Sequence, residues 1–323
     1  MDAAGVAGAV GSTVEDRSRT MNAIEQLSEA LAASVRLAGE SVVRVEGRRR
    51  LPSSGIVWSD DGLIVTACHT LGRRADLRVG LGGDSTPARL LGTDPGTDLA
   101  VLRLDRPLGR KPSPANIEEV RPGHLAIAVA RPGEGPQATL GIVSAVEGAW
   151  RSPLGGHLDH FVQSDVVMYP GFSGGALIDA WGRLIGMNSS GLARGVSLTV
   201  PAASLTRLVP ILAEHGRLRR GYLGVGVQPA RLPRLEGRAP QTAGLLVASV
   251  ESGSPAERGG LLLGDVLLSI EGRALATMED LLAALSADVV GKTVALEVLR
   301  GGRVSTLHVE VGERAAPSED EDE

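Results

Sequence analysis

The stretch YPGFSGGALID, residues 169–179, places glycines on both sides of Ser173 and then continues into an apolar, strand-like segment. Glycine reaches positive φ at little cost and lets another molecule approach the main chain closely. Such a stretch is typical of a reactive serine, and it is equally typical of a tight turn between two strands. The rest of the chain has to decide between these two interpretations.

Short apolar runs like the one after Ser173 recur from residue 41 to residue 200, and turn signals such as DDG, DPGTD and RPGE separate them. The runs read SVVRVEG, GIVW, LIVTAC, LRVGL, PARLLG, LAVLRL, LAIAVA, LGIVSAV, ALID, RLIGMNSS and GVSLTV. Many short strands at this spacing predict an all-β barrel or sandwich.

Three segments have the pattern of helices. Apolar residues at helical spacing predict one amphipathic helix over residues 21–39. A second is expected to begin at Pro201 and to stop at Gly216, the usual places for proline and glycine. A third, TMEDLLAALS, has Thr277 as its N-cap and lies among the strands of a separate block, residues 221–312.

Composition and charge exclude several classes of protein. The 323-residue chain carries a net charge of −5, and residues 313–323 alone hold six acids and one arginine, so the rest is formally neutral and lacks the basic stripe of a nucleic-acid-binding protein. There is no apolar run long enough to span a membrane. The single cysteine, Cys68, permits no internal disulfide, and the pair His157 and His160 lacks a third metal ligand. We therefore expect neither metal nor cofactor.

The N-terminus, MDAAGVAGAVGSTVED, has no basic region of the kind that opens a secretory signal. As written, the chain is expected to be cytoplasmic, or extracytoplasmic if a signal precedes it. Residues 1–21 are predicted to be disordered, and residues 313–323 to form an acidic, disordered tail.

A nucleophilic serine needs a base, and a histidine base needs a carboxylate that orients it. His69 is the best base because it follows the apolar run LIVTAC at the point where the chain turns. Asp98 is the best carboxylate, because it ends the turn TDPGTD and opens the apolar run LAVLRL, which would draw it inward. Capping of the DPGT turn fits Asp94 better.

Three ordered segments, TACH, DPGTDLAVLRL and SDVVMYPGFSGGALID, resemble those of the HtrA (DegP/DegS-like) serine proteases, and GYLGVGVQ with GLLVASVESGSPAERGGLLLGDVLLSIEG resembles their PDZ domain. The resemblance covers about residues 40–312. It implies a mainly β protein, in which a chymotrypsin-like double β-barrel precedes an α+β PDZ domain. The implied domains are residues 22–216 for the protease and residues 217–312 for the PDZ domain.

The resemblance also implies roles for individual residues. Ser173 would be the nucleophile, His69 the base and Asp98 its orienting acid, with the amides of Gly171 and Ser173 as the oxyanion hole. The substrate pocket would be walled by Val167, Met168, Met187 and Ser189, favouring small or medium aliphatic side chains. The PDZ domain would bind C-terminal peptides through Tyr222, Leu223, Gly224, Val225, Met278, Leu281 and Leu285.

The implied function is a serine endopeptidase that degrades unfolded or tagged proteins in quality control. One departure keeps an alternative open: Phe172 stands where the family usually has Asn or Asp, a bulky apolar group that we expect beside the oxyanion hole. The alternative is a catalytically weak, peptide-binding scaffold. Family members often form homotrimers through N-terminal aromatic residues, and residues 1–57 contain none.

Overall fold

The computed structural model describes residues 9–47, 51–72, 76–193, 195–232 and 241–313. The chain forms two compact units, Met1–Arg217 and Leu218–Glu323, and this division lies beside the boundary predicted after residue 216. Residues 1–8 and 314–323, on which parts of the disorder predictions fall, lie outside the described residues.

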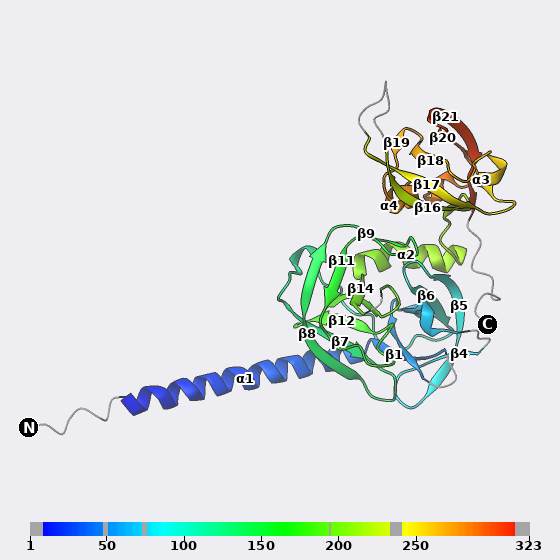
Figure 1. Cartoon of the computed structure of the whole chain (residues 1–323). Coiled ribbons are helices and arrows are strands. Elements are labelled where there is room, and N and C mark those ends of the chain that lie inside the picture. Colours follow the sequence, from blue (N-terminus) through cyan, green and yellow to red (C-terminus); the bar gives the residue numbers. More distant parts are fainter. Residues whose placement is uncertain (1–8, 48–50, 73–75, 194, 233–240, 314–323) are drawn as a thin grey trace, which may run out of the picture. The chain divides into compact units, whose positions relative to one another are not determined.

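The first unit contains two closed, six-stranded antiparallel barrels (Figure 1). The strands of the first barrel are β1 (Val42–Glu46), β2 (Ser53–Val57), β3 (Leu63–Ala67), β4 (Leu77–Gly80), β5 (Ser85–Asp94) and β6 (Leu99–Leu104), in the order β1-β2-β3-β6-β5-β4. Buried aliphatic side chains such as Val45, Ile64 and Leu102 fill its interior.

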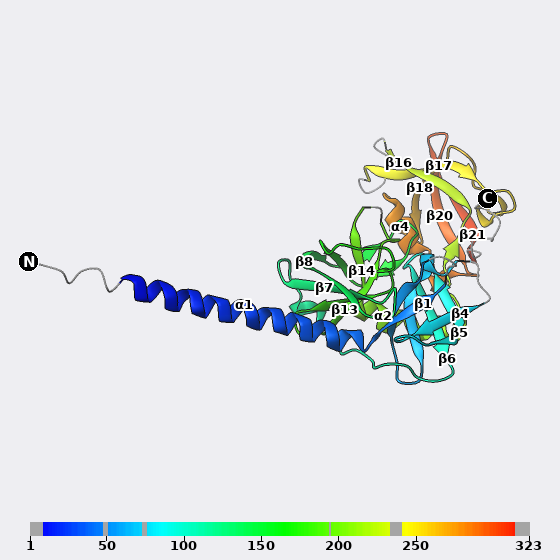
Figure 2. The same cartoon turned by 90° about the horizontal axis from the view of Figure 1, so that it is seen from below.

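The second barrel is also closed, and its strands lie in the order β11-β14-β13-β12-β7-β8. Its strands are β7 (Leu125–Ala130), β8 (Gln137–Glu147), β11 (Phe161–Ser164), β12 (Ala176–Asp179), β13 (Leu184–Ser189) and β14 (Ser197–Pro201), with a separate hairpin of β9 (Trp150–Arg151) and β10 (His157–Leu158). Figure 2 shows the blue and cyan strands of the first barrel and the green strands of the second as two groups. The double β-barrel predicted from the sequence is thus confirmed.

Helices flank these barrels. The helix α1 (Ala9–Gly39) begins well before the predicted start, so the expectation of disorder is wrong for residues 9–21. No proline, which would remove a backbone N–H, interrupts the helix over residues 9–39. The helix α2 (Ala202–His215) follows Pro201 and ends at Gly216, whose φ is 77°, as its sequence predicts. Short 3₁₀ helices lie at η1 (Cys68–Thr70) and η2 (Ile117–Glu119).

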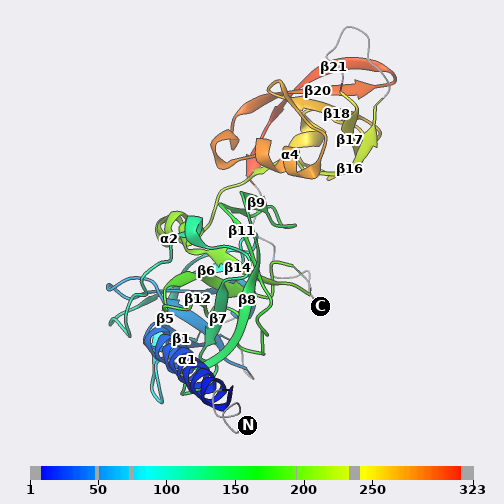
Figure 3. The ribbon, with the colours of Figure 1, turned by 90° about the vertical axis from the view of Figure 1, so that its left-hand side faces the viewer.

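The second unit has the α+β composition expected of a PDZ domain. One sheet runs in the order β16-β17-β18-β20-β21, with α4 next to β16 (Figure 3). Its elements are β15 (Gly221–Tyr222), β16 (Val225–Arg231), β17 (Ala243–Val250), α3 (Pro255–Arg258), β18 (Val266–Ile270), β19 (Arg273–Ala274), α4 (Met278–Ala284), η3 (Ala287–Val289), β20 (Thr293–Arg300), β21 (Arg303–Glu310) and β22 (Gly312–Glu313). Thr277 caps α4 as predicted, forming a capping box with Asp280.

Within the residues described, no helix combines the length and the apolar character needed to cross a membrane.

Candidate active site

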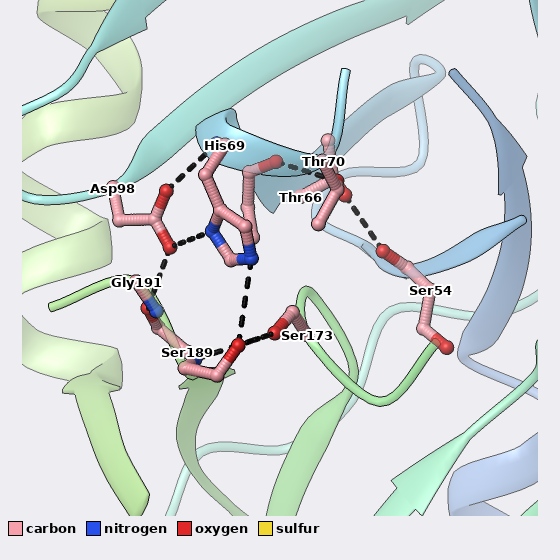
Figure 4. Close-up of polar contacts among 10 residues, drawn as sticks. Ser54, Thr66, His69, Thr70, Asp98, Ser173, Ser189 and Gly191 are labelled. Carbon is pink, nitrogen blue, oxygen red and sulfur yellow. Dashed lines mark hydrogen bonds and ion pairs between the residues drawn. The ribbon is translucent and has the colours of Figure 1, made fainter. Parts of the chain in front are cut away.

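His69 lies where β3 leaves the first barrel and enters the short helix η1. Its ring Nδ1 donates to Oδ2 of Asp98 at 2.7 Å, and its backbone N–H donates to Oδ1 of the same carboxylate at 2.9 Å (Figure 4). Both oxygens of Asp98 therefore hold one residue, and the ring can turn only by breaking the bond at Nδ1. With Nδ1 protonated in this way, Nε2 is the nitrogen that can accept a proton.

Asp98 follows a turn between β5 and β6 and adopts φ = 53°, a conformation that non-glycine residues rarely take. The turn is fixed by Asp94, whose Oδ2 accepts from the backbone N of Thr97 at 3.0 Å and from its hydroxyl at 2.6 Å. This confirms the capping role predicted for Asp94. The backbone of Asp98 also forms a hydrogen bond to the segment of His69, because its carbonyl accepts from the N–H of Cys68 at 3.0 Å. Both the side chain and the main chain of Asp98 thus join the segment that carries His69.

Ser189, at the end of β13, donates its hydroxyl to Oδ2 of Asp98 at 2.5 Å. Ser189 was predicted to wall the substrate pocket, and its bond to the carboxylate was not predicted. The two residues are far apart in the sequence, and no local pattern distinguishes this serine from its neighbours. The bond matters because Asp98 is 3% exposed, and a buried carboxylate is costly unless its oxygens accept hydrogen bonds.

Ser173 lies on the loop before β12, and its hydroxyl is 2.9 Å from the hydroxyl of Ser190. The Ser190 hydroxyl is in turn 3.5 Å from Nε2 of His69, and the Ser190 N–H donates to Oγ of Ser173 at 3.3 Å. A second serine therefore lies between the predicted nucleophile and the predicted base. Catalytic hydrogen bonds are often long without substrate and shorten when the substrate binds.

The backbone before Ser173 turns sharply. The N–H of Phe172 donates to the carbonyl of Tyr169 at 3.0 Å, and Gly171 adopts φ = 91°, as the third residue of a type II turn requires. The carbonyl of Phe172 accepts from the N–H of Gly175 at 3.0 Å. Because N–H and C=O point in opposite directions across a trans peptide, the N–H of Ser173 is turned away from Gly175.

Phe172 does not stand beside this turn as an obstacle. Its side chain is 1% exposed and belongs to the core of the second barrel, where its ring meets that of Tyr169 edge to face at 5.8 Å. The expectation that Phe172 crowds the oxyanion hole is therefore wrong. Burial of an aromatic ring is favourable, so the loop directs Phe172 inward.

A cleft of about 320 Å³ adjoins His69 and Ser173. Of the predicted pocket residues, Met168 lines it, while the side chain of Val167 is 52% exposed. Met187 is fully buried within β13, and the hydroxyl of Ser189 is bound to Asp98. The structure thus corrects the predicted pocket, because the side chains of Met187 and Ser189 do not line this cleft. Tyr169 and Leu51, which were not predicted as pocket residues, do line it.

In the second unit, the four residues predicted to bind a peptide carboxylate connect β15 to β16. The carbonyl of Leu223 accepts from the N–H of Ala256 at 2.8 Å, and the carbonyl of Gly224 accepts from the N–H of Glu251 at 2.9 Å. Both carbonyls are thereby held against the domain. Gly224 adopts φ = 79°, so glycine is needed at this bend.

The predicted peptide contacts on and after α4 differ in exposure. Leu281 and Leu285 belong to the core of the domain, whereas Met278 is 37% exposed. The strand β16 lies at one end of the sheet and next to α4. An edge strand beside a helix is the arrangement to which an extended peptide can add as a further strand.

Comparison with known proteins agrees with this architecture. Residues 53–187 match the trypsin-like peptidase domain family, and residues 221–311 match the PDZ domain family. The solved structure titled "HtrA-type protease AlgW with decapeptide" is 31% identical, with a TM-score of 0.72 over 89% of this chain and 99% of that one. The chain belongs to the HtrA family of serine proteases.

Curated members of the HtrA family are also similar. A "Probable periplasmic serine endoprotease DegP-like" of Pseudomonas fluorescens is 34% identical over 83% of this chain, and one of Chlamydia trachomatis is 32% identical over 86%. The chain spans 57% and 56% of the lengths of these two relatives.

Proposed function

We propose that this HtrA-family chain is a serine endopeptidase. The observation that carries the proposal is the convergence of His69, Asp98 and Ser173, from three separate segments, beside a cleft that His69 and Ser173 line. Ser173 Oγ would attack the carbonyl carbon of a peptide bond while Nε2 of His69 takes its proton. Asp98 would keep the proton on Nδ1 and stabilise the imidazolium that forms.

The amides of Gly171 and Ser173 would bind the oxyanion of the tetrahedral intermediate. His69 would then give its proton to the leaving amine, which leaves an acyl-enzyme on Ser173 for water to hydrolyse. For these reaction steps, the Ser173 hydroxyl has to reach Nε2 of His69. The Ser190 hydroxyl, which lies between them, therefore has to move aside when the substrate binds. Ser190 is exposed, and such a side chain changes rotamer rapidly.

The substrates we propose are unfolded or tagged proteins, with small or medium aliphatic side chains preferred beside Met168. The PDZ domain would bind C-terminal peptides along β16, with Tyr222, Leu223, Gly224 and Val225 around the peptide carboxylate. Solved structures of the HtrA-type protease AlgW with a decapeptide and with a tripeptide support peptides as ligands. The relatives named periplasmic support an extracytoplasmic location rather than the cytoplasmic one. A homotrimer remains a prediction that sedimentation of the full chain tests.

Cleavage of casein by the wild type and by Ser173→Ala, with a fluorophosphonate label on each, tests the proposed activity. We expect cleavage and labelling in the wild type, and the loss of both in the variant. Neither cleavage nor label in the wild type, with peptide binding by the PDZ domain intact, would favour the scaffold function instead.

A further inference from the structure

Ser54 is buried in β2 of the first barrel, yet its hydrogen bonds reach the loop that carries Ser173. We propose that Ser54 is a positioning residue that holds the oxyanion loop, residues 169–175, in the geometry needed for catalysis. The proposal rests on the proposed endopeptidase function, because it assigns a role within that site.

The side chain of Ser54 joins two segments of the second barrel. Its Oγ accepts from the backbone N–H of Arg131 at 2.8 Å and lies 2.7 Å from the carbonyl of Gly171. The amide of Arg131 can only donate, so the single hydroxyl hydrogen of Ser54 is left for Gly171. The direction of both bonds is therefore fixed.

The backbone of Ser54 makes two more bonds. Its N–H donates to the carbonyl of Ser173 at 3.2 Å. Its carbonyl accepts from the hydroxyl of Thr66 at 2.6 Å (Figure 4). Thr66 lies on the neighbouring strand β3, three residues before His69. The contact that orients the loop is thus anchored to the strand that carries the base.

These bonds fix two peptide planes of the loop at both ends. The carbonyl of Gly171 binds Ser54 while the N–H of the same plane, from Phe172, binds Tyr169. The carbonyl of Ser173 binds Ser54 while the N–H of Gly174 donates to Asn188 at 2.8 Å. The peptide plane that carries the N–H of Ser173 lies between these two held planes, so its rotation is restrained on both sides.

The close approach of the loop to Ser54 also explains Gly174. A side chain at this position would collide with the carbonyl oxygen of Ser54 and would lie 2.6 Å from the Thr66 hydroxyl, and the φ of Gly174 is 85°. The glycine after the nucleophile thus allows the first barrel to touch the loop directly.

The substitution Ser54→Ala tests this role in the full chain. It removes the bonds of the hydroxyl to Gly171 and to Arg131 and leaves the triad side chains unchanged. Loss of a complete oxyanion donor lowers kcat by about 10²- to 10³-fold. Because Ser54 acts only by orientation, we expect kcat for a peptide amide to fall by about 10- to 100-fold, with KM nearly unchanged.

The affinity for a peptide aldehyde distinguishes this positioning role from a purely structural one, which would leave that affinity unchanged. The aldehyde adds reversibly to Ser173, and the resulting hemiacetal oxygen occupies the oxyanion position. Its affinity should fall by the same factor as kcat in Ser54→Ala. Affinity for the corresponding peptide alcohol, which cannot form this adduct, should stay the same.

Ser204 on α2 provides a matched control. It is also fully buried, and its hydroxyl accepts from the N–H of Asp159 at 2.9 Å and donates to that carboxylate at 2.8 Å. Ser204→Ala should lower the melting temperature as Ser54→Ala does, yet leave kcat and aldehyde affinity within about twofold of the wild type. If Ser54→Ala does not fold, Ser54→Cys keeps a side chain of similar size with a weaker donor and should show the same paired losses.

A folded Ser54 variant could keep the wild-type kcat and aldehyde affinity while Ser173→Ala loses both. This result would overturn the role of Ser54 and leave the endopeptidase function standing. A wild-type chain with neither turnover nor aldehyde binding would overturn the endopeptidase function, and the role of Ser54 with it.

Discussion

Gly191 packs so closely against His69 that a methyl group on Gly191 would lie 2.6 Å from Nδ1 of the imidazole ring. The same methyl group would lie 3.0 Å from Oδ2 of Asp98. The residue after Ser190 therefore has to be glycine if the bond between His69 and Asp98 is to form.

We expect Gly191→Ala to lower kcat/KM by at least about 100-fold, because the added methyl group displaces His69 from Asp98. Gly148→Ala is the control, since a methyl group there would meet nothing within 4 Å. Both variants should unfold at temperatures close to that of the wild type. Wild-type turnover in Gly191→Ala would show that the site has room that the structure does not give it.

Ser190→Ala should make the unliganded site more reactive. Without this hydroxyl, Ser173 loses a partner at 2.9 Å and can bind His69 directly. One hydrogen bond contributes about 1 kcal/mol, so fluorophosphonate labelling should accelerate about fivefold. Slower labelling would indicate that Ser190 instead carries the proton from Ser173 to His69. Ser252→Ala, an exposed serine in the PDZ domain, is the control.

Cys68 precedes His69 but should be chemically inert. Burial, with smaller contributions from the negative charges of Asp98 and Asp94, raises the pKa of its thiol to about 12. The thiolate fraction at pH 8 is then about 10³-fold below that of an ordinary cysteine. We expect no reaction with Ellman's reagent at pH 8 in the native state and rapid reaction in guanidinium chloride. Rapid native reaction would contradict this protonation state.

Asp265 should make the PDZ domain sensitive to acid. Burial by itself raises the pKa of this carboxyl, but hydrogen bonds from Arg300 and the amide of Leu262, with the charge of Arg300, outweigh it and hold the pKa below its ordinary value. Two bonds of 2.7 Å join Arg300 to the carboxylate. A lowered folded-state pKa gives a stabilisation that is complete above the unfolded value of about 4 and is lost as the pH falls through the folded value.

Amide exchange in β18 of the full chain measures this effect. Protection in the wild type should decrease as the pH falls below about 4. In Asp265→Asn the protection should be lower at neutral pH and change less with acid. Glu279→Gln, which removes an exposed carboxyl, should behave like the wild type. An unchanged acid response in Asp265→Asn would refute the linkage.

Met278→Asp should weaken peptide binding at the PDZ domain. Met278 is 37% exposed at the start of α4, beside the edge strand β16. Replacing an apolar side chain by a charged one removes the favourable free energy of burying apolar surface against the peptide. The affinity for a decapeptide with a free C-terminal carboxylate should therefore fall by about tenfold. Leu263→Asp, at a side chain that is 71% exposed, should leave affinity unchanged. Equal losses in both variants would place the peptide elsewhere.

Much of the site was predictable because its signals are local. His69 and Asp98 each lie where an apolar strand meets a turn, and glycines flank Ser173. The contacts of Ser54, Ser189 and Ser190 were not predictable in this way. Each joins residues that are distant in the chain, and a serine in a strand looks the same whether its hydroxyl meets a carbonyl or a carboxylate.

Phe172 shows that the sequence can also suggest a contact that the fold does not make. Its position next to Ser173 suggested crowding of the oxyanion hole, because the sequence gives the neighbour but not the direction of the side chain. The turn from Tyr169 to Phe172 sends the ring into the core of the second barrel.

The early start of α1 was also not predicted, since polar and small residues can extend a helix without any apolar periodicity.

The sequence by itself predicted the strands, the two-domain division and the choice of His69, Asp98 and Ser173 as the residues that come together, since these depend on hydrophobic periodicity and on turn residues close in the chain. Only the tertiary structure decided how Ser54 orients the oxyanion loop, how Ser189 satisfies Asp98, and where Phe172 and Ser190 lie. Those outcomes depend on hydrogen bonds and packing between segments that meet when the barrels close, and the geometry of such contacts is set by the whole fold.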